Sequence, residues 1–198
     1  MEDCISKCYF MIGVEILMVK KTILPAILIA SFALAPFAVH ADAYADLGKA
    51  KAAFDATHSW HAVEQMSNSH TVIMDHVAPD RWRIQMMPGM SEIMIGSDMY
   101  MVRNGQTMHM PMVMPQIQQM VNQDWLTITP EIKRTLRDLG MQKVNGTLLH
   151  AYSYSANGNT VTLYLSSDHL PAVSVVHTSN GKVTITYSGY NTAITINP

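Results

Sequence analysis

The sequence predicts a single α+β domain built on one strongly curved antiparallel sheet with a few helices. Eight short segments rich in Val, Ile, Thr and Tyr are separated by Pro, Gly, Asn and Asp, a texture typical of strands and turns. Residues that tolerate positive φ stand in four of the gaps, at Gly96-Ser97, Asn104-Gly105, Asn157-Gly158 and Asn180-Gly181. A sheet of eight or more strands with few helices to cover it must curl around its apolar side chains.

The first predicted element is an amphipathic helix over Tyr44–Thr57. Leu47, Ala50 and Phe54 recur there at helical spacing, and an acidic residue precedes the two lysines as the helix dipole favours. After Trp60 the pattern changes to strands. They are predicted over Thr71–Val77, Trp82–Met87, Glu92–Ile95, Met99–Arg103, Leu148–Tyr154, Thr160–Leu165, Ala172–His177 and Lys182–Tyr190.

The strands are expected to form an antiparallel meander with one apolar face and one solvated face. In the last of them, Val183, Ile185 and Tyr187 alternate with polar residues. Between the two groups of strands, Pro115–Asp124 and Pro130–Leu139 are predicted to be helical. The second of these helices opens on an N-cap threonine, a proline and an acid, and is expected to end at Gly140.

Residues 1–41 contain the three parts of a secretory signal peptide. A basic start at Met18-Val19-Lys20-Lys21 precedes an apolar run over Ile23–Val39, and small residues follow at the −3 and −1 positions. We expect cleavage after Ala41 or Ala43 and a mature periplasmic or secreted domain over 42–198. The alternative is an uncleaved membrane anchor, but the run is at the lower limit for a span and contains two prolines.

Residues 1–17 place three acidic residues where a signal peptide has its basic start, so we expect translation to begin at Met18. Both cysteines, Cys4 and Cys8, lie in this upstream stretch. The mature domain is therefore expected to lack disulfides and to depend on its own core. No cysteine follows the apolar run, so lipid attachment of the bacterial lipoprotein kind is not expected either.

Composition and motifs exclude several classes of function. With 13 basic and 15 acidic residues the chain lacks the positive surface of a nucleic-acid binder, and 48% hydrophobic residues exclude disorder. The sequence contains no G-x-S-x-G, H-E-x-x-H, GxGxxG or P-loop motif. Asp75-His76 and Asp168-His169 are unsuited to act as dyads, because adjacent strand residues point to opposite faces. We therefore predict no enzymatic activity and no cofactor.

Methionine is the unusual feature of the composition. The chain has 17, of which 11 lie between Met86 and Met120. In the extended segment 108–114, four methionines point to one side and His109, Pro111 and Val113 point to the other. Three explanations remain open: an adaptable apolar ligand surface, an ordinary core, or a Cu(I) site. The Cu(I) site would use Met108, His109, Met110, Met112 and Met114. A histidine metal site at His58 and His61 is not expected, since no carboxylate or cysteine recurs at ligand spacing.

Four pieces of sequence, in order, carry a resemblance to a known family. They are Val77–Arg83, Glu92–Tyr100, Val144–Thr147 leading to Tyr152, and Tyr187–Asn191 running on to Pro198. With them, the chain after Trp60 resembles the LolA-like lipoprotein-carrier superfamily, the curved-sheet lipid binders of the LolA, LolB, LppX and LprG type. The resemblance implies an exported, non-catalytic domain whose incomplete barrel is lidded by helices and holds acyl chains. The specific pattern of the dedicated lipoprotein carrier is absent, so lipoprotein shuttling is not implied.

These observations together predict a carrier or binding protein for a lipid, a lipoprotein acyl chain or a similar amphiphile. We expect a monomer that meets a membrane or a lipoprotein partner only transiently. A structural or partner-binding module is the remaining alternative and would show a large exposed apolar patch without a cavity. The predicted lining and lid residues are Met86, Met94, Met99, Met101, Met108, Met110, Met112, Met114 and Met120, with Trp82 and Trp125 as aromatic walls.

Overall fold

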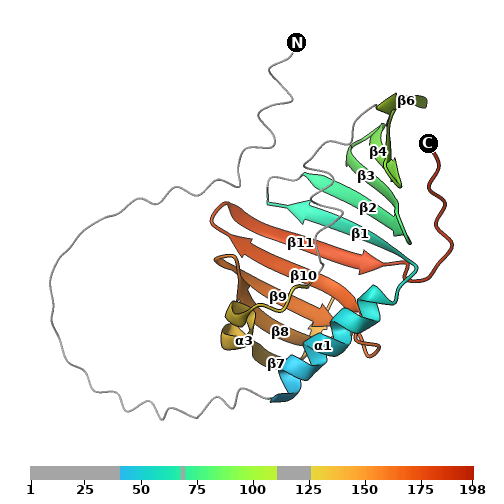
Figure 1. Ribbon diagram of the computed structural model, residues 1–198. Helices are drawn as coiled ribbons and strands as arrows, with labels where there is room; N and C mark the ends of the chain where they lie inside the picture. Colours follow the sequence, from blue (N-terminus) through green and yellow to red (C-terminus); the bar gives the residue numbers. More distant parts are fainter. Residues whose placement is uncertain (1–40, 68–69, 111–125) are drawn as a thin grey trace, which may run out of the picture. The chain divides into compact units, whose positions relative to one another are not determined.

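The computed structural model describes residues 41–67, 70–110 and 126–198, which form two helices and eleven strands (Figure 1). The helices are α1 (Ala41–Asp55) and α3 (Pro130–Thr135). The strands are β1 (Ser59–Met66), β2 (Thr71–Val77), β3 (Arg81–Met87), β4 (Met90–Ile95), β5 (Asp98–Arg103), β6 (Gln106–Met110), β7 (Arg137–Val144), β8 (Thr147–Ala156), β9 (Asn159–Leu165), β10 (Pro171–Thr178) and β11 (Gly181–Ser188).

All eleven strands belong to one antiparallel sheet, in the order β6-β5-β4-β3-β2-β1-β11-β10-β9-β8-β7. Each strand pairs with its neighbours in sequence, except that β1 and β11 pair with each other at the centre. This confirms the predicted meander. The sheet bends along its length in Figure 1, and its end strands β6 and β7 do not pair, so it does not close into a barrel. With two short helices beside eleven strands, the domain is mostly β, and the α+β class describes it only roughly.

Hairpin turns hold the meander at the positions that the sequence indicates. Asn104 and Gly105 both have positive φ, at 51° and 77°, in the turn between β5 and β6. Asn157 and Gly158 have the same conformation between β8 and β9. Two successive positive φ angles match the right-handed twist of the flanking strands.

The helices pack on one face of the sheet, which we call the inner face. It carries Ala62, Met74 and Ile84 in one half and Tyr152 and Leu163 in the other. Leu47 and Ala50 of α1 pack with Tyr152 and Leu163, together with Ile132 of α3. Figure 1 shows both helices in front of the β7–β10 half. The opposite side of the sheet is the outer face.

Helix α1 confirms the first predicted helix with slightly shifted ends, whereas α3 is shorter than predicted. The Thr129 hydroxyl caps α3 by accepting from Ile132 N at 3.2 Å, and Pro130 occupies the first turn. The helix ends at Thr135, because Leu136 is extended and β7 begins at Arg137. The expectation of a helix to Leu139 was wrong, since pairing with β8 outweighs helix propensity in these residues.

Strands β1, β6 and β7 were absent from the predicted set. Strand β1 has the sequence SWHAVEQM, which contains one β-branched residue, so its strand propensity is weak. It becomes a strand because β2 and β11 supply partners on both sides. The predicted helix over Pro115–Asp124 lies outside the described residues, as do residues 1–40 of the predicted leader.

Candidate functional site

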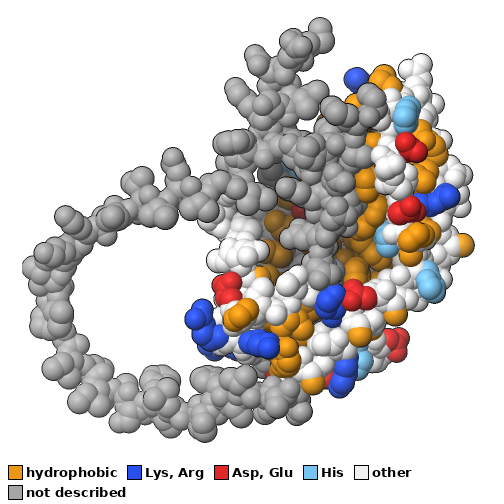
Figure 2. Space-filling model, viewed as in Figure 1, with side chains coloured by type: hydrophobic (Ala, Val, Ile, Leu, Met, Phe, Trp, Pro, Cys, Tyr) orange, Lys and Arg blue, Asp and Glu red, His pale blue; other side chains and the backbone are white. Residues whose placement is uncertain are grey.

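Seven of the eleven predicted lining residues lie together on the inner face of β3–β6. They are Trp82, Met86, Met94, Met99, Met101, Met108 and Met110. With Val72, Met74 and Ile84 they form what we call the methionine face. Met112, Met114, Met120 and Trp125 lie outside the described residues. Figure 2 shows hydrophobic side chains gathered over this half of the sheet.

The strand register places the sulfur atoms in rows across the sheet. Trp82 stands opposite Met94, which stands opposite Met99 on the next strand, which in turn stands opposite Met110. In the neighbouring row, Met101 stands opposite Met108. Side chains opposite one another on one face are in contact range, so the rows form a continuous thioether surface.

Burial of the methionines decreases toward the edge of the sheet. Met99 is 1% exposed and Met94 is 8% exposed, whereas Met108 on edge strand β6 is 63% exposed. Met86, Met101 and Met110 are half-buried. A face of this kind offers apolar, flexible side chains to a partner without exposing them fully to water.

An aromatic cluster joins the methionine face to α1 and to β11. Trp60 packs edge-on against Trp82 at 5.4 Å between ring centroids and tilts against Phe54 of α1 at 5.7 Å. Tyr187 of β11 meets the Trp60 ring at 6.3 Å. Ala62 and Tyr190 complete this cluster. Trp60 therefore lies where the two halves of the inner face meet.

Two polar side chains of the inner face each have a buried atom without a hydrogen bond among the described residues, and the sequence did not lead us to expect either of them there. Glu92 of β4 is 6% exposed, and its Oε2 atom has no hydrogen-bond partner among the described residues. His76 of β2 lies between Trp60 and Trp82, with ring centroids 5.5 and 4.3 Å away, and its Nδ1 atom also lacks a partner in the described part of the chain. Burial raises the pKa of Glu92 and lowers the pKa of His76.

A signal for Glu92 was present in the sequence. It stands two residues before Met94 in a predicted strand, and residues two apart share a face. Predicting Met94 on an apolar lining therefore placed Glu92 there too. Glu64 of β1 also lies on the inner face, opposite Val72 and Ile185, and burial raises the pKa of its carboxyl group.

The outer face carries a separate ionic cluster around Asp75. This carboxylate accepts from Arg83 Nε at 2.9 Å and lies 2.8 Å from His61 Nδ1. Asp75 thus bonds on the outer face while its neighbour His76 packs on the inner face. The two adjacent residues point apart, as expected, and they form no dyad.

His109 likewise lies on the other side of β6 from Met108 and Met110. Its ring packs against Tyr100 at 5.1 Å between centroids, and its Nε2 atom is 3.4 Å from Asp98 Oδ1. Strand alternation separates this imidazole from the two thioethers, so the three do not converge on one point. Within the described residues, no group of three or more His, Cys, Asp or Glu side chains is placed to hold a metal ion.

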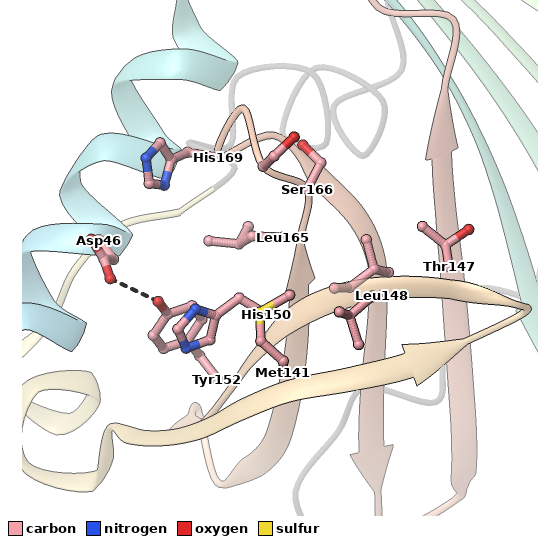
Figure 3. Close-up of a pocket in the computed structure, with 11 residues that line it drawn as sticks. Asp46, Met141, Thr147, Leu148, His150, Tyr152, Leu165, Ser166 and His169 are labelled. Carbon is pink, nitrogen blue, oxygen red and sulfur yellow. Dashed lines mark hydrogen bonds between the residues drawn. The ribbon is translucent and has the colours of Figure 1, made fainter.

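A pocket of about 300 Å³ lies in the other half of the sheet, beside α1 (Figure 3). It is lined by Asp46, Met141, Thr147, Leu148, Leu149, His150, Tyr152, Leu165, Ser166, Ser167 and His169. None of these is a predicted lining residue. Met141 and Leu148, both more than half exposed, give it an apolar wall.

Several polar side chains of this pocket are hydrogen-bonded or stacked. Tyr152 donates its hydroxyl to Asp46 at 2.8 Å, as Figure 3 shows, and stacks on His150 at 4.6 Å. His150 in turn lies 2.6 Å from Asp138. The Lys49 ammonium bonded to Asp46 lowers the pKa of that carboxyl group. Ser166 Oγ accepts from Leu170 N of its own turn.

Neither a membrane-spanning helix in the described residues nor a sequence match indicates a function for the chain. No helix among residues 41–67, 70–110 and 126–198 combines the length and the apolarity needed to cross a bilayer. No protein-family model and no curated protein sequence matches the chain.

Comparison with solved structures finds the same fold in two mycobacterial proteins. The lipoprotein LppX of Mycobacterium tuberculosis aligns with a TM-score of 0.62 at 10% identity, over 79% of this chain and 98% of LppX. LprF of Mycobacterium bovis aligns with a TM-score of 0.55 at 16% identity, over 79% of this chain and 96% of LprF. At such identities the likeness shows a shared fold: the chain has the fold of LppX and LprF, as the resemblance of its sequence motifs implied.

Proposed function

We propose that this protein is a non-enzymatic, extracytoplasmic binding protein for a lipid or a similar amphiphile. The observation that carries the proposal is the methionine face, where thioethers from four neighbouring strands make a half-buried apolar surface. Methionine is unbranched and polarizable, so such a surface adapts to flexible chains of varied shape. A core built only for rigidity favours Leu, Ile, Val and Phe.

The energy of such binding comes mainly from chain length. Each buried methylene contributes about 0.8 kcal/mol, so eight of them contribute about 6 kcal/mol before the costs of ordering the ligand. A long acyl chain lying across three or four strands reaches that number. The ligand is therefore expected to remain bound through purification.

The fold and the leader support an exported location. LppX, which shares the fold, is a lipoprotein, and residues 18–41 have the pattern of a signal peptide. We propose that the mature domain spans 42–198 and that cleavage follows Ala41. Cleavage after Ala43 is less favourable, because it would remove Ala43 from the domain. Ala43 is buried in the same core cluster as Leu47.

Organic extraction of the purified protein followed by mass spectrometry tests the proposal. We expect a lipid or another amphiphile at close to one equivalent per chain, because burial of its chain slows release. Protein stripped by the extraction and refolded serves as the control, and it should take up a fluorescent fatty acid. A folded monomer that carries nothing and takes up no fluorescent amphiphile would contradict the proposal.

Copper binding remains a second candidate, because Met99 and Met101 stand opposite Met110 and Met108. Thioether ligands select Cu(I), whereas lipid binding depends on apolar volume. We expect the variant with all four of these methionines changed to leucine to keep its amphiphile affinity within about threefold, since Leu and Met volumes are similar. The matched control is Met87→Leu, which changes an exposed methionine at the end of β3 and should alter neither Cu(I) binding nor amphiphile binding. Tight one-to-one Cu(I) binding that disappears in the fourfold variant would favour copper instead.

A further inference from the structure

Glu92 lies in the middle of the methionine face. It stands opposite Ile84 on β3 and Met101 on β5. Met94 is its neighbour on the same face of β4. Only 6% of Glu92 is exposed. The carboxyl group thus has apolar residues opposite it on both neighbouring strands and beside it on β4.

The carboxyl group of Glu92 has an oxygen without a hydrogen bond. Its Oε2 atom is buried and unpartnered in the part of the chain that the structure describes. Leaving such an oxygen unpaired costs free energy that a single O–H or N–H donor offsets. The group is therefore aimed at something that donates a hydrogen bond and that the described residues do not supply.

The charged and titratable groups on the same face disfavour an anion. Glu64 on β1 adds a second carboxyl group. His76 on β2 is half-buried, and desolvation lowers its pKa, so the neutral form dominates near pH 7 and provides no positive charge. Arg103 stands at the exposed end of β5, opposite Met90, and forms no ion pair with Glu92. A phosphate or carboxylate near Glu92 would meet repulsion and no buried cation.

His76 supplies a second unpaired polar atom on this surface. Its Nδ1 atom is buried between the rings of Trp60 and Trp82, two strands away from Glu92. A neutral imidazole nitrogen accepts or donates a hydrogen bond according to its tautomer. The apolar surface thus contains two unpaired polar atoms, Glu92 Oε2 and His76 Nδ1, and each can accept a hydrogen bond. The described inner-face residues of β1–β4 include no lysine or arginine.

We propose, on the basis of the lipid-binding function above, that the methionine face selects amphiphiles whose polar end is a hydrogen-bond donor, a hydroxyl or an amine, and that Glu92 determines this specificity. The acyl chain lies on the thioethers, and the hydroxyl or ammonium group donates to Glu92 Oε2. A fatty acid or a lipid phosphate binds more weakly, because a second acidic group beside the buried Glu92 makes it more costly for either group to be ionised.

Competition among three ligands with one chain length tests this proposal. Hexadecanol, hexadecylamine and hexadecanoate displace the uncharged probe N-phenyl-1-naphthylamine from the delipidated full-length mature protein at pH 7.5. We expect the alcohol or the amine to bind at least tenfold more tightly than hexadecanoate. The comparison of alcohol with amine shows whether a neutral donor or a cation is preferred.

Two variants assign the preference to Glu92. Glu92→Gln keeps the shape and removes the charge, so hexadecanoate should come within about threefold of the best ligand. Glu92→Met also removes the hydrogen bond, and should weaken the alcohol about tenfold. Glu131→Gln on α3, which packs over the other half of the sheet, is the matched control. It should leave the affinities for the alcohol and the amine relative to hexadecanoate unchanged. Melting curves check that the variants fold. Glu92→Gln should not lower the melting temperature, because it replaces a buried ionisable group with a neutral one.

Failure of this inference is distinct from failure of the proposed function. If none of the three ligands displaces the probe and the probe itself does not bind, the lipid-binding function is wrong. If all three bind equally, or if hexadecanoate binds best, the lipid-binding function stands and the selectivity is wrong. Equal ratios in wild type and Glu92→Gln would also overturn the role of Glu92.

Discussion

Trp60→Ala is expected to lower the free energy of unfolding by about 3–5 kcal/mol, the range for a truncated buried tryptophan. Trp60 is 7% exposed and packs against Phe54, Trp82 and Tyr187. The substitution therefore opens a cavity where α1, the methionine face and β11 meet. Urea denaturation followed by far-ultraviolet circular dichroism measures the change, because fluorescence would itself be altered by losing one of three tryptophans.

A matched variant separates the volume of Trp60 from its aromatic contacts. Trp60→Phe retains a ring and part of the volume, so it should cost clearly less than the alanine substitution. Binding of the naphthylamine probe should weaken in the alanine variant, since Trp60 supports Trp82 on the methionine face. A loss below about 1 kcal/mol for Trp60→Ala would mean that the cluster does not join the two halves as described.

Leu47→Ala is expected to lower the free energy of unfolding by about 2–5 kcal/mol. Leu47 is fully buried and anchors α1 to the inner face, where it shares a cluster with Tyr152 and Leu163. The helix itself gains from alanine, so the whole loss comes from packing. Thermal and urea denaturation measure the difference.

Ala52→Ser, an exposed position on the same helix, is the control and should cost no more than about 0.5 kcal/mol. Equal effects at positions 47 and 52 would show that α1 contributes through its own helicity and does not dock on the sheet. A large effect at position 47 alone would confirm docking.

The sequence allowed most of the strand pattern to be predicted, together with the gathering of several methionines on one face, because the signals for both are local. Alternation along an extended chain is local, and it placed Met108 and Met110 on one side of their segment before any pairing was known. The pairing that brings Met110 opposite Met99 joins two strands, and the two-residue turn Asn104-Gly105 between them fixes its register. The convergence of these methionines on one face followed from these two facts.

The missed features depend on contacts between residues far apart in the chain. Strand β1 has weak propensity, and it is held by β11, which lies at the other end of the domain. The first residues of β7, 137–139, follow α3 directly and were assigned to the predicted helix, although β7 pairs with β8 as a strand. The apolar surroundings of Glu92 and His76 were not predicted, because residues of the neighbouring strands create them.

The central pairing of the sheet has a consequence for the order in which the protein can assemble. Nearly every pairing joins strands adjacent in sequence, so each closes a short loop at small entropic cost. The pairing of β1 with β11 is different, because His61 meets Ser188 across most of the domain's length. Asn191 fastens this seam by donating to Ser59 O and accepting from His58 N. The main entropic barrier to forming the native topology is therefore concentrated in a single seam, on either side of which each row of hairpins is local.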